Sequence, residues 1–219
     1  MLSDQIKQIF VGVPEVLYGY ADISYSAFTE EYKSALVLAV PYDEQLTLQN
    51  YTEERFDKSI LNAKAKLETI LKDIETALQE EGIKYYIPMI AQQNEEDLLA
   101  EFSFKYAAVN AGLGWIGKND VLITEKYGPR VRLSVVLIDY PLEPGNKITE
   151  SRCASCRKCV DICPHKALTG LDWDINARRN DIIDYHLCNL KRSKYIEKHG
   201  RKSSCGLCMV VCPYGIEKG

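Results

Sequence analysis

All eight cysteines of this 219-residue chain lie between Cys153 and Cys212, and none occurs in the first 152 residues. Disulfide bonds in a small secreted protein usually staple the whole chain, whereas cysteines gathered in one segment are typical of a metal site. The N-terminal residues show neither a basic flank nor a hydrophobic signal core, and no run of about 18 apolar residues occurs. We therefore expect a cytoplasmic protein without a membrane span, whose last third binds metal.

The spacing of the cysteines is that of a bacterial two-cluster ferredoxin. Cys153 opens the pattern C-x2-C-x2-C-x3-C-P, and Cys212-Pro213 closes a second lobe in the same way. In such modules the cysteine before the proline binds the other cluster. The spacing therefore predicts two [4Fe-4S] clusters. The first takes the ligands Cys153, Cys156, Cys159 and Cys212, and the second takes Cys163, Cys188, Cys205 and Cys208.

Cys188 departs from a symmetric ferredoxin, because sixteen residues separate it from Cys205 where two are usual. A helix is expected just before it, over residues 175–187. Two zinc sites with four thiolates each are the main alternative, but zinc needs neither three cysteines in succession nor a closing Cys-Pro. A regulatory disulfide set would not need this spacing. Three histidines could also ligate a metal, although the cysteines already fill eight positions: His165, His186 and His199.

The charge, like the cysteines, is distributed unevenly between the last third of the chain and the residues before it. Residues 151–219 contain 13 Lys plus Arg against 7 Asp plus Glu, so this part is near +6, and the residues before it are near −10. The basic tail has two interpretations: a surface for phosphates such as those of RNA, or compensation for the negative charge of thiolate-ligated clusters. Its densest positive stretch runs from Lys191 to Lys202.

The first 140 residues mix predicted helices and strands. Apolar side chains recur every three to four positions over residues 52–81, which predicts a long amphipathic helix capped by Thr52 and ended by Gly82. Residues 34–40 are an apolar run typical of a buried strand. Shorter helices are expected over 4–10 and 94–110, and strands over 20–24, 83–87, 121–124 and 131–139. The fold class is α+β, with an α/β domain over residues 1–147 and a two-cluster ferredoxin-like module over 148–219.

One segment, Gly112-Leu-Gly-Trp-Ile-Gly117-Lys-Asn119, holds three glycines in six residues. Such spacing marks a backbone that bends tightly or approaches something closely. A plain turn from helix to strand explains it as well as a binding loop does.

The ordered succession of motifs resembles the epoxyqueuosine reductase family, with a weaker likeness to corrinoid reductive dehalogenases. The resemblance covers roughly residues 105–213, and more loosely residues 34–42. The motifs that carry it are Ala111-Gly-Leu-Gly-Trp-Ile-Gly-Lys-Asn119, Leu122-Ile-Thr, Tyr127-Gly-Pro-Arg-Val-Arg-Leu133, Asp139-Tyr-Pro-Leu142 and the cysteine run from Cys153.

The resemblance implies a nitroreductase-like N-terminal domain that holds cobalamin near the first cluster. It also implies an enzyme that removes the epoxide oxygen of epoxyqueuosine in tRNA, with electrons from a low-potential donor of the ferredoxin or flavodoxin type. The residues expected near the cobalamin are Gly112, Gly114, Trp115, Gly117, Lys118 and Asn119.

Two departures from the family shape the functional hypotheses. The family's acidic proton donor lies just before the glycine motif, and Asp97 lies near that position without matching the pattern, so no catalytic residue is assigned. The helical-repeat extension that helps the family grip tRNA is not present in these residues, so we expect a short form. The main hypothesis is a cobalamin-dependent iron–sulfur reductase. The alternatives are an electron carrier or reductive activator of a corrinoid protein, and a zinc-containing RNA-binding protein.

Overall fold

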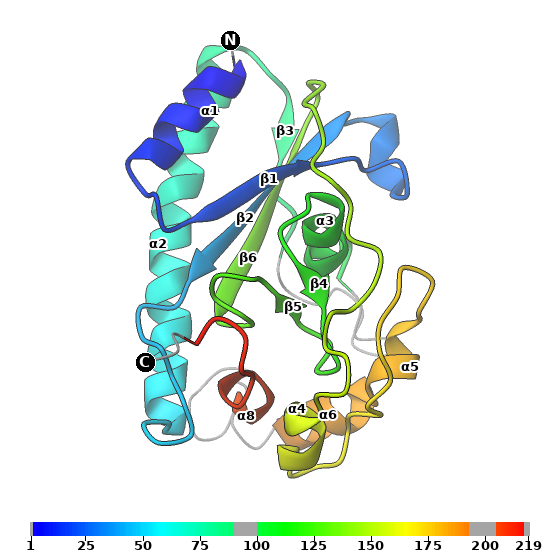
Figure 1. The fold of residues 1–219 in the computed structure, drawn as a ribbon. Coiled ribbons are helices and arrows are strands. Elements are labelled where there is room, and N and C mark those ends of the chain that lie inside the picture. The colour runs from blue at the N-terminus through cyan, green and yellow to red at the C-terminus, as the bar shows by residue number, and fades with distance from the viewer. Residues whose placement is uncertain (1, 90–99, 193–204, 217–219) are drawn as a thin grey trace. The chain divides into compact units, whose positions relative to one another are not determined.

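The computed structural model describes residues 2–89, 100–192 and 205–216 of the chain (Figure 1). Their contacts define two compact units, each assembled from three segments. The first unit contains Met1–Pro41, Asn62–Leu113 and Val131–Ile148, and the second contains Tyr42–Leu61, Gly114–Arg130 and Thr149–Gly219. The expected division into domains 1–147 and 148–219 stays a prediction.

A four-stranded antiparallel sheet with the strand order β1-β2-β6-β3 forms the first unit's framework. The long strands β2 (Ser34–Pro41) and β6 (Val131–Ile138) pair along their whole length. Residues 34–40 are all buried, which confirms the buried strand that their apolar run predicted. The edge strands are β1 (Leu17–Ala21) and the two-residue β3 (Tyr85–Tyr86).

Helices cover both faces of this sheet. Figure 1 shows α1 (Leu2–Val11) and residues 62–80 of α2 (Glu53–Glu80) on one side, and α3 (Phe104–Asn110) on the other. Phe10 of α1 stacks on Tyr18 of β1 with ring centroids 3.8 Å apart. The helix α3 packs against β1, β2 and β6. Mixed helix and sheet content is thus confirmed for the part of the chain before the cysteines.

The predicted long helix is confirmed almost to the residue. Thr52 Oγ1 accepts a hydrogen bond from the backbone N–H of Arg55 (3.2 Å), which satisfies a free donor of the first turn. At the other end Gly82 has φ +65°, and Ile83 N–H donates to the Leu78 carbonyl (2.9 Å). This left-handed glycine is a common helix stop, because a side chain there would be strained.

Four predicted elements have different bounds in the structure. The strand expected over 20–24 ends at Ala21, because the Asp22 carboxylate accepts hydrogen bonds from the Ser24 N–H and hydroxyl and turns the chain. The strand expected over 83–87 is reduced to β3, and the one over 121–124 to β5. Residues 100–103 are not helical, and α3 begins after Ser103, whose Oγ accepts from Tyr106 N–H. Residues 94–99 of that expected helix lie outside the described residues.

The second unit is built from short elements. A hairpin of β4 (Trp115–Ile116) and β5 (Leu122–Ile123) pairs antiparallel, and α4 (Lys158–Ile162) packs against α8 (Leu207–Val210). The helix predicted over 175–187 is two helices, α5 (Arg179–Ile182) and α6 (Tyr185–Arg192). They are separate because Ile183 is extended and forms a β-bridge with Leu168.

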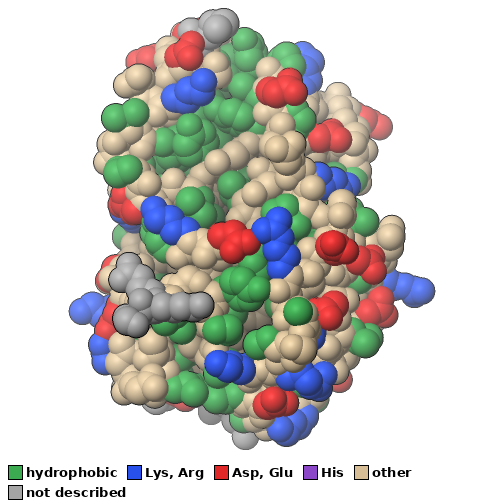
Figure 2. Space-filling model, viewed as in Figure 1, with side chains coloured by type: hydrophobic (Ala, Val, Ile, Leu, Met, Phe, Trp, Pro, Cys, Tyr) green, Lys and Arg blue, Asp and Glu red, His purple; other side chains and the backbone are tan. Residues whose placement is uncertain are grey.

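The remaining helical element is the short 3-10 helix η1 (Ala27–Glu30) in the first unit. On the face drawn in Figure 2, Lys and Arg side chains lie among Asp and Glu side chains. Within the described ranges, no helix combines the length and the apolar character that a membrane crossing needs.

Candidate metal centre

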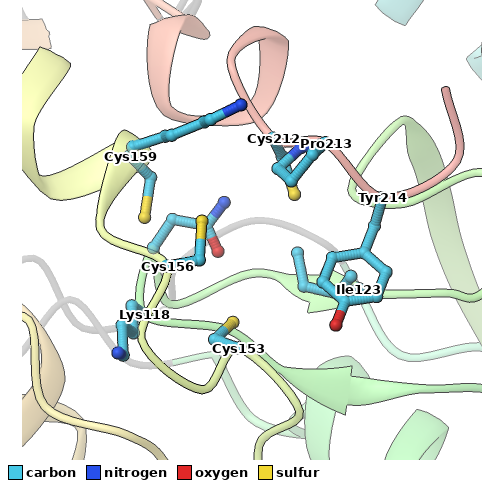
Figure 3. Close-up of a pocket in the computed structure, with 10 residues that line it drawn as sticks. Lys118, Ile123, Cys153, Cys156, Cys159, Cys212, Pro213 and Tyr214 are labelled. Carbon is cyan, nitrogen blue, oxygen red and sulfur yellow. The ribbon is translucent and has the colours of Figure 1, made fainter.

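Four cysteines surround one cavity of the second unit (Figure 3). The cavity encloses about 310 Å³, part of it open to solvent, and the four sulfur atoms point toward this common space. Cys153 and Cys156 come from the loop that leads into α4, Cys159 lies in the first turn of α4, and the fourth cysteine comes from the segment after α8. They are the residues that the spacing assigned to the first cluster: Cys153, Cys156, Cys159 and Cys212.

Burial makes two of these thiols, those of Cys159 and Cys212, hard to ionise without a metal. It raises the pKa of Cys159 to about 12, and the neighbouring cysteines add to the shift. Burial also raises the pKa of Cys212 to about 11, although Arg130 acts in the opposite direction. A coordinating metal reverses this balance because it binds the thiolate and displaces the proton. The donor chemistry of the cavity therefore fits an iron–sulfur cluster.

The loop of the first three cysteines is held by a buried lysine. Lys118 has only 4% of its surface exposed, and its Nζ donates a hydrogen bond to the Ala154 carbonyl (2.5 Å). Ala154 has φ +48°, a left-handed conformation that is unfavourable for a residue with a side chain. The same Nζ lies 3.4 Å from Asp172 Oδ2. Lys118 thus fixes the turn between Cys153 and Cys156 and places a cation beside the cavity.

We expect Lys118→Met to loosen the first cluster. A hydrogen bond from a charged donor contributes about 1.5–3 kcal/mol, and its loss corresponds to a cluster released about tenfold faster or more. Iron release to a chelator from anaerobically prepared protein measures the effect. Lys158→Met is the matched control, because Lys158 lines the same cavity with an exposed side chain. Equal release rates for the two variants would contradict the holding role of Lys118.

The second set of cysteines also comes together. Cys163, Cys188 and Cys208 pack against one buried cluster of apolar residues, formed by Val160, Ala167, Leu168 and Ile183. Burial raises the pKa of Cys208 well above its ordinary value, and the next causes are four nearby thiols: Cys205, Cys159, Cys188 and Cys163. Cys188 reaches this group from α6, where its N–H donates to the Asp184 carbonyl (3.0 Å).

Asn119 connects the two sets. Its side chain lines the cavity of the first set, and its Nδ2 donates to the carbonyl of Cys208 in the second set (3.0 Å). Asn119 is 4% exposed, so this contact is protected from water. The resemblance implied that Lys118 and Asn119 lie near a cobalamin, and the structure places both beside the cysteines.

The glycine motif is packed against the chain's own backbone. In the first unit, Gly112 has φ +73°, and a Cβ there would lie 2.7 Å from the Asn146 carbonyl oxygen. In the second unit, a Cβ on Gly114 would lie 2.1 Å from the Ile123 oxygen, and one on Gly117 would lie 2.8 Å from Ile123 Cγ1. These contacts alone require glycine, as the plain-turn interpretation expected. Whether the segment also approaches a cobalamin stays a prediction.

Trp115, between these glycines, has no exposed surface, and its ring meets the ring of Tyr214 edge to face at 4.8 Å. Tyr214 lines the first cavity, two residues after Cys212. The tryptophan thus supports the segment that carries the fourth cysteine.

The sequence reasoning missed three supports of this site. Arg130 is 4% exposed and donates to four backbone carbonyls, two of them at Val210 and Cys212. Gly128 and Tyr214 pack closely against each other. The signal was present, because Tyr127-Gly-Pro-Arg130 is one of the motifs of the resemblance and Arg130 stands directly before an apolar strand. A charged residue at a buried strand end needs an internal partner.

Some candidate residues lie outside the described part. They are Asp97, His199 and most of the basic stretch that begins at Lys191, of which the structure describes no side chain. Their predicted roles stay predictions.

The comparisons with known proteins agree with this site. Residues 152–215 match the family of 4Fe-4S double cluster binding domains, so the cysteine-bearing part of the chain is a two-cluster iron–sulfur module. About half to two thirds of the chain is similar in sequence to epoxyqueuosine reductases, which confirms the resemblance carried by its motifs. An epoxyqueuosine reductase of Listeria monocytogenes is 35% identical over 150 residues, which are 67% of this chain and 38% of that protein.

Solved structures share the fold. An epoxyqueuosine reductase with an epoxyqueuosine-modified tRNA stem loop has a TM-score of 0.62 at 19% identity, over 98% of this chain and 64% of that one. A reductive dehalogenase, whose structure suggested a mechanism for B12-dependent dehalogenation, has a TM-score of 0.62 at 18% identity, over 97% of this chain and 31% of that one. The matched region spans about a third of the length of the curated relatives, 30–38% in the first three.

Proposed function

We propose that the chain is an iron–sulfur reductase of the epoxyqueuosine reductase type, in which two [4Fe-4S] clusters deliver electrons to a cobalamin-dependent reaction. The observation that carries the proposal is the convergence of Cys153, Cys156, Cys159 and Cys212 on one cavity beside the buried Lys118. A carrier of thiolate-bound iron needs four such donors, a space between them and a nearby cation to offset negative charge.

We assign the ligands as two sets of four. The first cluster is held by Cys153, Cys156, Cys159 and Cys212, and the second by Cys163, Cys188, Cys205 and Cys208. The exchange of Cys163 and Cys212 between the two lobes is supported by the lining of the first cavity, which includes Cys212 and does not include Cys163.

The bound clusters would supply single electrons at low potential. The chain's own residues exclude water and fix the ligands: Lys118 holds the first loop, and Asn119 ties the first cavity to the second set. Asn119 also forms a direct connection between the two sets, since it lines the first cavity and donates to the carbonyl of Cys208 in the second set. We place the electron path between the clusters along this contact.

We include cobalamin in the proposal because the fold of the chain is similar to that of a reductive dehalogenase studied for B12-dependent chemistry. We propose a nitroreductase-like fold for the α/β part on the same basis. The described contacts of Gly112, Gly114 and Gly117 are with the chain's own atoms, and Lys118 and Asn119 are engaged with the cysteine loops. The approach of a cobalamin to this segment stays a prediction, and no catalytic step is assigned to these residues.

The proposed substrate is an epoxide-bearing nucleoside in tRNA, because the sequence relatives are epoxyqueuosine reductases and one structural neighbour holds a modified tRNA stem loop. Removal of an epoxide oxygen as water consumes two electrons and two protons. A ferredoxin- or flavodoxin-type donor would provide the electrons, one at a time, through the clusters.

Anaerobic purification with added cobalamin tests the proposal. Iron, sulfide, zinc and cobalt are counted per chain, and the protein is then incubated with tRNA from a strain that lacks epoxyqueuosine reductase. We expect two clusters, a corrinoid with an altered visible spectrum, and conversion of epoxyqueuosine to queuosine. Unchanged epoxyqueuosine with a fully loaded protein would remove this substrate.

Two other functions give different results in the same experiment. An electron carrier or activator of a corrinoid protein would hold both clusters and bind no cobalamin tightly. A zinc-containing RNA-binding protein would show zinc without iron or sulfide. Four thiolates hold zinc about 2.3 Å away, and among the described residues no three His, Cys, Asp or Glu side chains converge on a single-ion site.

A further inference from the structure

Arg130 is a buried cation in the second unit, and the hydrogen bonds that its guanidinium donates all go to backbone carbonyls. Its Nε donates to Leu46 O (3.1 Å), and its Nη1 donates to Tyr214 O (2.9 Å). Its Nη2 donates to both Val210 O and Cys212 O, each at 2.9 Å. Within the described part of the chain, no carboxylate pairs with this guanidinium. A positive charge is thus kept in the interior without a negative side chain to balance it.

Three of the four carbonyls belong to the segment that carries the fourth cysteine of the first set. Val210 precedes Cys212, Tyr214 follows it, and the third acceptor is Cys212 itself. A guanidinium presents its donors in a rigid plane, so this fork fixes several points of the segment at once. A lysine has one nitrogen and could not reach all these carbonyls.

The charge of Arg130 also acts on the first set of cysteines. The Nη2 of Arg130 lies 2.9 Å from the carbonyl oxygen of Cys212, a proposed ligand of the first cluster, so the positive charge lies next to that set. Reduction adds a negative charge to a cluster, and a cation in a low-dielectric interior stabilises the reduced form. Lys118 lies beside the same cavity but has Asp172 within 3.4 Å, which offsets part of its charge.

We infer that Arg130 is a positioning residue that anchors the Cys212 segment and raises the reduction potential of the first cluster, which makes electron transfer to this cluster more favourable. The inference rests on the proposed function, since it requires both clusters to be bound.

A redox titration of the full chain, followed by electron paramagnetic resonance without oxygen, tests the inference. Arg130→Gln removes the charge, and Arg130→Lys keeps the charge while losing the fork. Arg55→Gln is the matched control, because Arg55 is an exposed arginine of the same unit that pairs with Glu44. A Cys163→Ala variant, which keeps the ligands of the first cluster alone, identifies the signal of that cluster.

For Arg130→Gln we expect the potential of the first cluster to fall by at least about 59 mV, the one-electron equivalent of a tenfold change in the reduction equilibrium. The second cluster and the Arg55→Gln protein should keep their potentials. Arg130→Lys should keep the wild-type potential of the first cluster but release its iron faster.

The outcomes separate the inference from the proposed function. A wild-type protein without two clusters contradicts the proposed function. If Arg130→Gln assembles both clusters and their potentials are unchanged, the inference is overturned and the proposed function is not. If neither Arg130 variant assembles the first cluster but both keep the second, the anchoring role is supported. Loss of both clusters in these variants overturns the anchoring role.

Discussion

Removal of Cys212 should cost the chain one complete cluster, although this residue lies next to Cys205 and Cys208 in the sequence rather than to Cys153. We expect Cys212→Ala to lose about four of the eight iron atoms that two [4Fe-4S] clusters contain. The lost cluster should be the one formed by the first loop, because Cys212 lines the cavity of Cys153 and Cys159. Iron and sulfide analysis of anaerobically reconstituted protein measures the loss.

Two double variants distinguish this exchange of ligands from clusters that are local to each lobe. Cys153→Ala with Cys212→Ala removes two ligands of one cluster, so the iron content should equal that of either single variant. Cys163→Ala with Cys212→Ala removes one ligand from each cluster, so almost no iron should remain. Non-additive losses of this kind are the signature of residues that act as one unit.

Local clusters would put Cys153 and Cys163 in one cluster and Cys212 in the other, so both double variants would lose almost all of their iron. Ser155→Ala is the control for the loop, because Ser155 is an exposed residue between two ligands. It should hold as much iron as the wild-type protein.

The cysteine grouping could be predicted from the sequence because cluster chemistry fixes the spacing of its ligands. Even Cys188, which stands apart from Cys205, lies with the second set in the structure. The long helix α2 was also predictable, since its apolar side chains repeat at the helical period and Thr52 and Gly82 mark its ends.

Other elements were decided by contacts that a sequence pattern does not contain. β1 ends at Ala21 because of a local hydrogen bond between Asp22 and Ser24, and the helix expected over 175–187 is interrupted because Ile183 forms a bridge to Leu168. The support of the site depends on tertiary contacts as well: Arg130 finds its acceptors among carbonyls that are about 80 residues away in the sequence.

The glycine motif shows why a sequence pattern alone does not identify a function. Three glycines in six residues indicate a close approach, and the structure shows that Gly114 and Gly117 approach Ile123 of the neighbouring strand. The motif therefore has a structural reason to contain glycine in the absence of any ligand. Evidence for cobalamin has to come from a binding measurement rather than from this motif.

The second large effect concerns Gly128, where a single added methyl group should disturb the Cys212 segment. Gly128 has φ +57°, and a Cβ there would lie 2.1 Å from the carbonyl oxygen of Tyr214. Left-handed backbone costs a residue with a side chain about 1–2 kcal/mol, and overpacking adds about 1–3 kcal/mol. We expect Gly128→Ala to lower the midpoint of denaturant unfolding and to reduce the iron of the first cluster, both measured without oxygen.

Gly82→Ala separates the two causes of this loss. Gly82 has almost the same backbone angle, φ +65°, but a Cβ there would meet nothing within 4 Å. This variant should therefore show the backbone cost alone, about 1–2 kcal/mol, and keep its full iron content. Because Tyr214 also accepts a hydrogen bond from Arg130, a displaced Tyr214 carbonyl weakens the anchor of Cys212 as well. Equal stability losses in the two variants, with iron retained in both, would mean that the contact between Gly128 and Tyr214 does not hold the fourth ligand in place.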